Sequence, residues 1–188
     1  MQHSLLCRAL LLVALVLLIG CAGRPVDAPL PKLAALPELA TRMQRLTFLQ
    51  QDRRHELIGA LRHDERSLRL ALLSPQGQRL LTLVQDDQGA RFLAGASFDP
   101  PFTAEWLANR LAWSLWPSSA LAQAFAGTDW ALVEDGEGRT IRYRNEDIAH
   151  VTGSAECRVI DDIVGNYRLT IAPLDDPTER TKALCPAD

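Results

Sequence analysis

The sequence predicts a mainly β fold of the α+β class: an incomplete antiparallel β-barrel, or strongly curved sheet, with a helical lid inserted between two sets of strands. Three observations support this fold class. Apolar and polar residues alternate from residue 45 to residue 93, as in strands with one buried face. The spacing then becomes helical between residues 103 and 127. Short alternating segments return after residue 130, which predicts a second set of strands.

The first segment, residues 1–20, is typical of a secretory signal peptide: a weakly basic start precedes a continuous apolar run over residues 10–19. The run is shorter than the roughly 20 apolar residues of a membrane span. It closes on Leu18-Ile19-Gly20-Cys21, which resembles the lipobox of bacterial lipoproteins. In that family the cysteine is acylated and becomes the first mature residue, so we expect lipidation at Cys21. The alternatives are an ordinary signal peptide with an incidental cysteine, and a short retained anchor.

The residue after the cysteine indicates the destination. In enterobacterial lipoproteins an aspartate there retains the protein in the inner membrane, whereas this chain has Ala22. The resemblance therefore implies the periplasmic face of the outer membrane, with the membrane contacted through the lipid anchor. Three acyl chains would make this anchor effectively permanent, since each buried methylene contributes about 0.8 kcal/mol.

Prolines at positions 25, 29, 31 and 37 follow, and they favour extended backbone. We therefore expect residues 21–36 to comprise the lipidated cysteine and a Pro-rich stalk, and residues 37–188 to form one domain. Pro37 suits the first turn of a helix, and Leu39 and Met43 have helical spacing. This spacing predicts a short helix at the start of the domain.

The first set of strands is predicted as a β-meander. Turn-forming residues at 51–53, 63–65, 74–77 and 86–89 separate the alternating runs. The apolar side of such a sheet either fills a core or lines a ligand cavity, and the alternation is the same in both cases. The candidate cavity residues are Leu46, Phe48, Leu68, Leu70, Leu72, Leu81 and Leu83.

Two helices are expected next. Thr103 is the predicted N-cap of the first and Pro117 ends it, after which Ser118 or Ser119 is predicted to cap a second helix that ends near Gly127. Packing of the first helix on the sheet alone would explain its apolar stripe. The sharper hypothesis is a lid over the concave face. The candidate lid residues are Trp106, Leu107, Leu111 and Trp113, with Arg110 on the same side as the two tryptophans.

The second set of strands is predicted at residues 130–133, 140–143, 147–151, 158–160 and 167–171. A tight turn at 164–166 separates the last two. Because an open sheet leaves unpaired edges, closure or a cover is expected.

This order of strands and helices, together with Leu72-Leu73-Ser74-Pro75-Gln76-Gly77 and the Pro117–Gly127 segment, resembles the lipoprotein-localisation factors LolA and LolB, especially the outer-membrane receptor LolB. The resemblance spans about residues 45–173. It implies an incomplete barrel, closed by helices, that holds lipoprotein acyl chains in a hydrophobic cavity. A closer resemblance is to small lipoproteins of the same layout, some of which accompany aryl-polyene biosynthesis genes. That resemblance makes a lipid with a conjugated acyl chain a candidate ligand.

One residue departs from the LolB pattern. LolB has a leucine between the proline and glycine of the turn at 74–77, and this leucine helps to insert cargo into the membrane. Here the position is Gln76, and burying an amide in hydrocarbon costs about 2–7 kcal/mol. Acyl-chain binding is therefore expected to be retained, whereas Gln76 disfavours the delivery of lipoproteins into a membrane.

The remaining cysteines suit a periplasmic location. With Cys7 in the signal peptide and Cys21 acylated, Cys157 and Cys185 are left as a pair. In an oxidising compartment we expect them to form a disulfide, worth about 2–4 kcal/mol. The alternative is two unpaired thiols.

Other classes of site have little support in the sequence. The formal net charge is −3 without a lysine or arginine cluster, so no nucleic-acid partner is expected. No His or Cys pair has metal-ligand spacing, so we expect neither metal nor cofactor. Gly153-Ser154 lacks the Gly-x-Ser-x-Gly pattern, so no catalytic residue is predicted and the protein is not expected to be an enzyme. We also expect a monomer.

Three functional hypotheses remain. The first is a carrier or acceptor of acyl chains, lipids or lipoproteins at the outer membrane. The second is a non-enzymatic lipoprotein with a filled core that docks a periplasmic partner. The third is a small periplasmic hydrolase such as a thioesterase. Free volume in the core favours the first over the second, and a polar group at the bottom of a cavity favours the third.

Overall fold

The structure is a computed structural model that describes residues 27–37, 39–97, 99–154, 156–174 and 185. The signal peptide predicted at residues 1–20, the lipidation site Cys21 and the first part of the predicted stalk lie outside these residues. None of the described helices is both long and apolar enough to cross a membrane.

Within the described residues, ten strands form one antiparallel sheet in the order β5-β4-β3-β2-β1-β10-β9-β8-β7-β6. Strands β5 and β6 lie at opposite edges of this order, so the barrel is incomplete, as the sequence predicted. The strands are β1 (Leu39–Gln50), β2 (Arg53–His63), β3 (Leu68–Leu73), β4 (Arg79–Asp86), β5 (Gly89–Phe92), β6 (Trp130–Glu134), β7 (Gly138–Tyr143), β8 (Glu146–Gly153), β9 (Arg158–Asp162) and β10 (Tyr167–Pro173).

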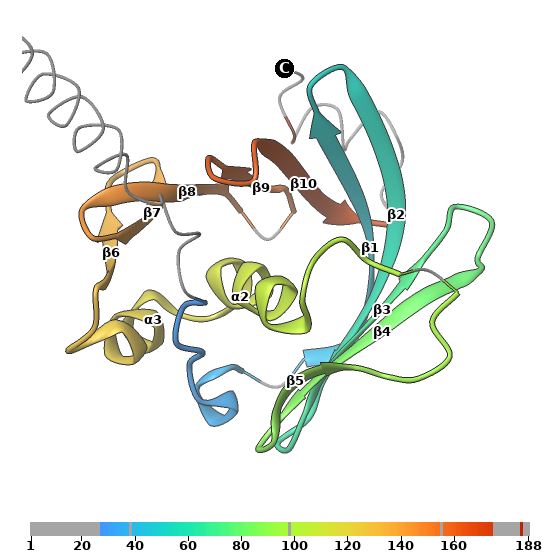
Figure 1. The fold of residues 1–188 in the computed structure, drawn as a ribbon, viewed down its shortest axis with the longest axis horizontal. Helices are drawn as coiled ribbons and strands as arrows, with labels where there is room; N and C mark the ends of the chain where they lie inside the picture. The colour runs from blue at the N-terminus through green and yellow to red at the C-terminus, as the bar shows by residue number, and fades with distance from the viewer. Residues whose placement is uncertain (1–26, 38, 98, 155, 175–184, 186–188) are drawn as a thin grey trace, which may run out of the picture.

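The pairing of β1 with β10 joins the two meanders into one curved sheet (Figure 1). In this pairing Leu46 lies opposite Ile171, and Phe48 lies opposite Leu169. Leu46 is opposite Leu57 on its other side. Because directly opposed residues share a face of the sheet, this register places apolar side chains from both meanders on the concave side.

Helix α2 (Ala104–Leu115) lies in the hollow of the sheet, and α3 (Ser118–Phe125) follows it (Figure 1). Thr103 caps α2 as predicted, because its hydroxyl accepts a hydrogen bond from the Trp106 N–H at 3.1 Å. The serine cap predicted for α3 is wrong. Pro117 occupies the N-cap position, and Ser118 lies inside the helix, where its hydroxyl donates to the Glu134 carboxylate.

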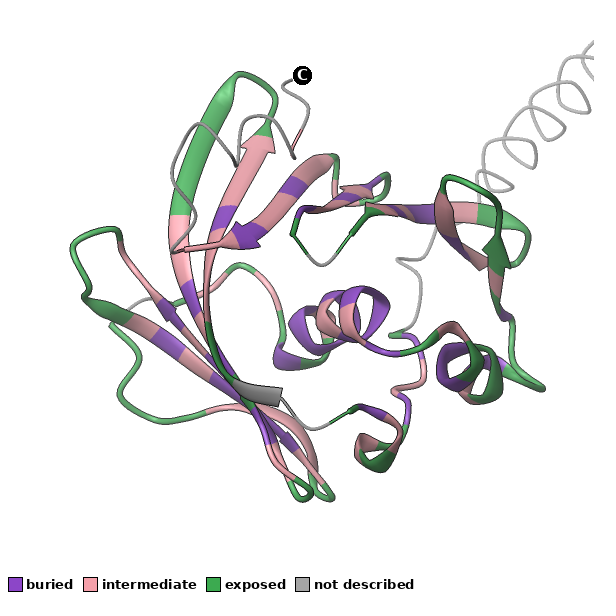
Figure 2. Cartoon of the chain, turned by 180° about the vertical axis from the view of Figure 1, so that it is seen from behind, coloured by how far each residue is buried: buried purple, intermediate pink, exposed green. Residues whose placement is uncertain are grey.

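Most of the α2 surface is buried (Figure 2). Ala108 and Ala112 are exposed by 0% and 1%, and their small side chains allow close packing against the helix. Trp113, exposed by 1%, adds bulk on another side. A helix that is buried on most sides is part of the hydrophobic core. Here α2 fills the hollow of the open, curved sheet (Figure 1).

Two predictions for the start of the domain are wrong. Residues 27–36 are not a free stalk: Ala28 and Leu36 are buried, and the Trp116 indole N–H donates to the Lys32 carbonyl at 3.0 Å. This segment contains a 3₁₀ helix, η1 (Leu33–Ala35). The helix expected from Pro37 is instead the beginning of strand β1, because hydrogen bonds to β2 and β10 outweigh a weak local spacing.

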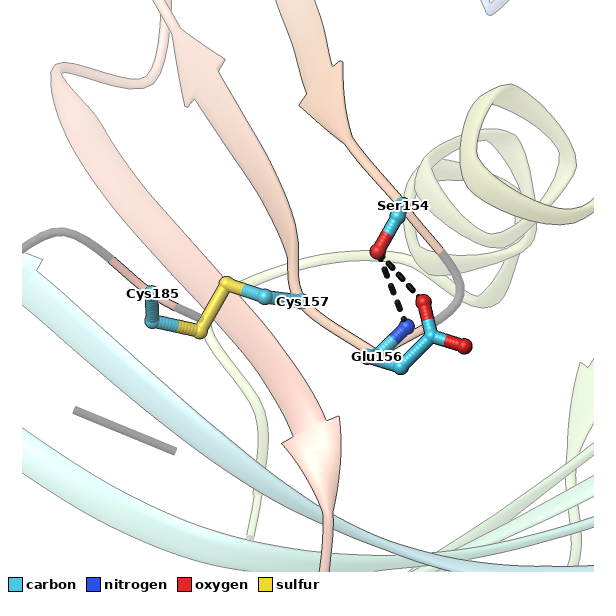
Figure 3. Close-up of a disulfide and its surroundings, with 4 residues drawn as sticks. All are labelled: Ser154, Glu156, Cys157 and Cys185. Carbon is cyan, nitrogen blue, oxygen red and sulfur yellow. Dashed lines mark hydrogen bonds between the residues drawn. A yellow bond between two sulfur atoms is a disulfide. The ribbon is translucent and has the colours of Figure 1, made fainter. Parts of the chain in front are cut away.

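The structure joins Cys157 to Cys185 in a disulfide, with a Cα–Cα distance of 5.4 Å (Figure 3), inside the usual range of about 4.4–6.8 Å. This agrees with the predicted pair. Cys157 immediately precedes β9, so the bridge attaches residue 185 to the start of that strand. In Figure 3 the Ser154 and Glu156 side chains hydrogen-bond to each other in the turn before it.

Candidate ligand cavity

An apolar cavity of about 200 Å³ lies between the concave sheet and α2. Its walls come from β1, β3, β9 and β10, and α2 supplies the opposite side. The volume is below the roughly 300–1,000 Å³ of drug-sized sites, yet above the roughly 150 Å³ that suffices for benzene in an apolar protein interior. A cavity of this size suits part of one acyl chain.

Four of the seven predicted cavity residues line it: Leu46, Phe48, Leu70 and Leu72. The other three, Leu68, Leu81 and Leu83, are buried in the hydrophobic core away from the cavity. The alternation with a period of two correctly placed all seven residues on the apolar face of the sheet. That face extends beyond the cavity, and the part outside the cavity packs into the hydrophobic core. These three residues therefore do not line the cavity, as the sequence analysis expected them to.

The predicted lid residues divide in the same way. Leu107 and Leu111 line the cavity from α2. Trp106 and Trp113 do not, because both lie against the Arg110 guanidinium, with ring centroids 4.1 and 4.6 Å from its central carbon. The tryptophans therefore position an arginine that reaches the cavity wall.

Several lining residues were not predicted. Ile160, Leu169 and Ile171 complete the apolar wall from β9 and β10. The same alternation used for β1 and β3 would have identified them, once the last strands were known to share the concave face. Arg42 and Arg158 give the cavity polar positions, and no pattern in the sequence marked either one.

Arg110 forms a buried ion pair with Asp162, at the end of β9. Its Nε and Nη2 atoms donate to Asp162 Oδ2 at 2.8 and 2.6 Å. Asp162 also accepts hydrogen bonds from the Gly165 N–H at 2.6 Å and from the Tyr167 hydroxyl at 3.0 Å. This network joins α2 to β9 and β10, and it neutralises the charge of Arg110 beside the cavity.

Burial raises the pKa of the Tyr167 phenol above its ordinary value, and the Asp162 carboxylate raises it further. A folded-state pKa above the unfolded one gives stability that is complete below the unfolded value of about 10. That stability is lost as the pH rises toward the folded-state value.

We therefore expect the free energy of unfolding to fall above pH ~10, by up to about 1.4 kcal/mol per pH unit from this group. Tyr167→Phe should make the fall less steep, which urea titrations between neutral pH and pH ~11 would measure. Equal slopes for the two proteins would contradict this role of Tyr167.

Two further arginines bind the carboxyl end of α2. Arg158 donates to the Ser114 carbonyl, and Arg139 donates to the Trp116 carbonyl at 2.8 Å. Cations are favourable at this end of a helix because of its partial negative charge. Burial lowers the pKa of both guanidinium groups, and Arg158 lowers the pKa of Arg139 further. Two partly desolvated positive charges thus lie close together at this end of α2.

The hydroxyls in the cavity wall do not have a histidine partner within the described part of the chain. Ser114 Oγ donates to the Leu111 carbonyl, and Ser154 Oγ donates to the Glu156 carboxylate at 2.6 Å. Nor do the described residues contain a group of three or more His, Cys, Asp or Glu side chains arranged to hold a metal ion. The absence of catalytic and metal-binding residues stays a prediction for the whole chain.

The fold and the cavity define a class: small α+β proteins in which an open, curved antiparallel sheet encloses a helix and an apolar cavity. The chain belongs to the family described as "Protein of unknown function (DUF3261)", whose model matches residues 41–175. The match spans nearly all of the sheet, with both helices and most of the cavity wall. No curated protein matches the chain.

Proposed function

We propose that this protein is a lipoprotein of the outer membrane, anchored through Cys21 on the periplasmic side, that binds or accepts an acyl-chain ligand in the cavity under α2. The observation that carries the proposal is the cavity itself, an apolar space of about 200 Å³ bounded by two meanders and a helix. Its free volume favours ligand binding over a filled core that only docks a partner.

The resemblance to LolA and LolB supports the same proposal from the sequence. The size of the cavity favours one acyl chain over the three chains of a lipoprotein anchor. Gln76 is exposed in the turn between β3 and β4, where LolB has a membrane-inserting leucine. Both observations favour binding of a single-chain lipid over delivery of whole lipoproteins.

The proposal predicts that filling the cavity abolishes binding. Leu111 is half-buried and lines the cavity from α2, so Leu111→Trp would place an indole in the free space. We expect a fluorescent medium-chain fatty acid to bind this variant at least about tenfold more weakly than the wild type, a loss of about 1.4 kcal/mol or more.

The matched control is Leu93→Trp, which adds the same side chain at an exposed position outside the cavity. This variant should bind within about twofold of the wild type. Circular dichroism and thermal unfolding would establish that both variants are folded. Equal binding by both variants would show that the fatty acid occupies another place and would sink the proposal.

A further inference from the structure

The charges around the cavity are one-sided. Its ionisable lining residues are Arg42, Arg110 and Arg158, and no Asp or Glu of the described residues lines it. Cations in the wall do not help a cavity to bind hydrocarbon, because each buried charge must be solvated or paired. The imbalance therefore bears on the identity of the ligand.

Only one of these three charges is neutralised within the described residues. Arg110 has the buried Asp162 carboxylate as its partner. The Arg158 guanidinium donates to a neutral carbonyl of α2, and burial alone lowers its pKa, without a carboxylate that raises it. The nearby Glu134 carboxylate raises the pKa of Arg139 but has no such effect on Arg158.

Arg42 is the third cation, on the same concave face of β1 as Gln44 and Leu46. Its side chain is exposed, and its guanidinium has no hydrogen-bond or ion-pair partner in the described part of the chain. A guanidinium in this state can turn two parallel N–H groups toward a carboxylate or phosphate. Arg42 and Arg158 thus both add positive charge to a cavity wall that is otherwise largely apolar.

From this arrangement we propose that the ligand is a single acyl chain with an anionic head, a carboxylate or a phosphate, which Arg42 binds, while Arg158 adds positive charge to the same cavity wall. The hydrocarbon part lies along Leu70, Leu111 and Leu169. The Gln44 amide lies in the same wall and supplies a further hydrogen-bond donor. This inference rests on the proposed acyl-chain binding and adds the chemistry of the head group.

The test uses the full-length protein in phosphatidylcholine vesicles and three photoactivatable probes with the same medium-length chain: a fatty acid, the corresponding fatty alcohol and the corresponding alkyl monophosphate. Each carries a diazirine near the end of the chain. Mass spectrometry of the labelled protein gives the yield and the labelled peptide. Labelling should fall on cavity-wall peptides such as those that contain Leu70 or Leu111.

Arg42→Gln removes one positive charge from an exposed position without disturbing the α2 cap formed by Arg158. The control is Arg45→Gln, three residues along β1 on the opposite face, outside the cavity. We expect Arg42→Gln to lower labelling by the fatty acid or the monophosphate on the order of tenfold. It should leave labelling by the alcohol within about twofold, and Arg45→Gln should behave as the wild type does.

Comparison of each variant with the wild type cancels differences in how the probes partition into the vesicles. A loss with the fatty acid alone would identify a carboxylate head, and a loss with the monophosphate alone would identify a phosphate head. Equal labelling of wild type and Arg42→Gln by all three probes would overturn the anionic head and leave acyl-chain binding standing. Absence of cavity labelling with every probe would overturn both proposals.

Discussion

Replacement of Asp162 by alanine is expected to lower the free energy of unfolding by about 3–5 kcal/mol. The substitution would leave the charge of Arg110, a residue only 8% exposed, unpaired in the interior. It would also remove the acceptor of the Gly165 N–H and the Tyr167 hydroxyl. Breaking a buried pair costs more than the pair contributes, since desolvation of the remaining charge is no longer offset. Urea unfolding of the two proteins would measure the difference.

Asp161→Ala provides the matched control. Asp161 is the preceding residue and pairs with Arg168, but the two side chains are 35% and 41% exposed, so its loss should cost no more than about 1 kcal/mol. Arg110→Met combined with Asp162→Leu should recover much of the stability lost in the single variant, because no buried charge remains. Similar losses for Asp161→Ala and Asp162→Ala would show that the buried network does not hold α2 to the sheet.

The second large effect is expected from Trp113→Ala, which should lower the free energy of unfolding by about 3–5 kcal/mol. Trp113 is 1% exposed, its ring lies 6.2 Å from that of Trp130, and it also flanks Arg110. Its removal would leave a large void between α2 and the second meander, which a helix enclosed on most sides cannot move to fill.

Two comparisons make this prediction specific. Trp113→Phe should cost less than Trp113→Ala, since it keeps an aromatic ring and removes an indole N–H that has no acceptor among the described residues. Val164→Ala, at a position 50% exposed, should change the stability by no more than about 0.5 kcal/mol. Calorimetry or urea unfolding of the three variants would give the order, and a small effect of Trp113→Ala would contradict the role of α2 as the centre of the core.

The fold was largely predictable because its strands carry a strong local signal. Leu68, Leu70 and Leu72 alternate with less apolar positions, and turn-forming residues separate this strand from its neighbours. The start of β1 was missed because Leu39 and Met43 fit a helix when read alone. Pairing with β2 and β10 decides that segment, and β10 is distant in the sequence.

The site was less predictable because its polar part is assembled from distant residues. Arg110 was placed correctly beside Trp106 and Trp113 from helical spacing alone. Its partner Asp162 lies 52 residues away, a separation that helical spacing does not relate to Arg110. The face of the sheet that lines the cavity was predictable from the alternation of apolar and polar residues. The extent of the cavity depends on where α2 packs, and sequence periodicity does not determine that.

The most direct test of acyl-chain binding is native mass spectrometry with lipid extraction, on protein made in the periplasm with the signal peptide exchanged and Cys21 replaced. We expect a co-purifying compound with one acyl chain and an acidic head, which is present on the wild type and depleted from Leu111→Trp. Acyl-chain binding would be contradicted by a folded protein that is purified without any such compound and that takes up neither added fatty acid nor added alkyl phosphate.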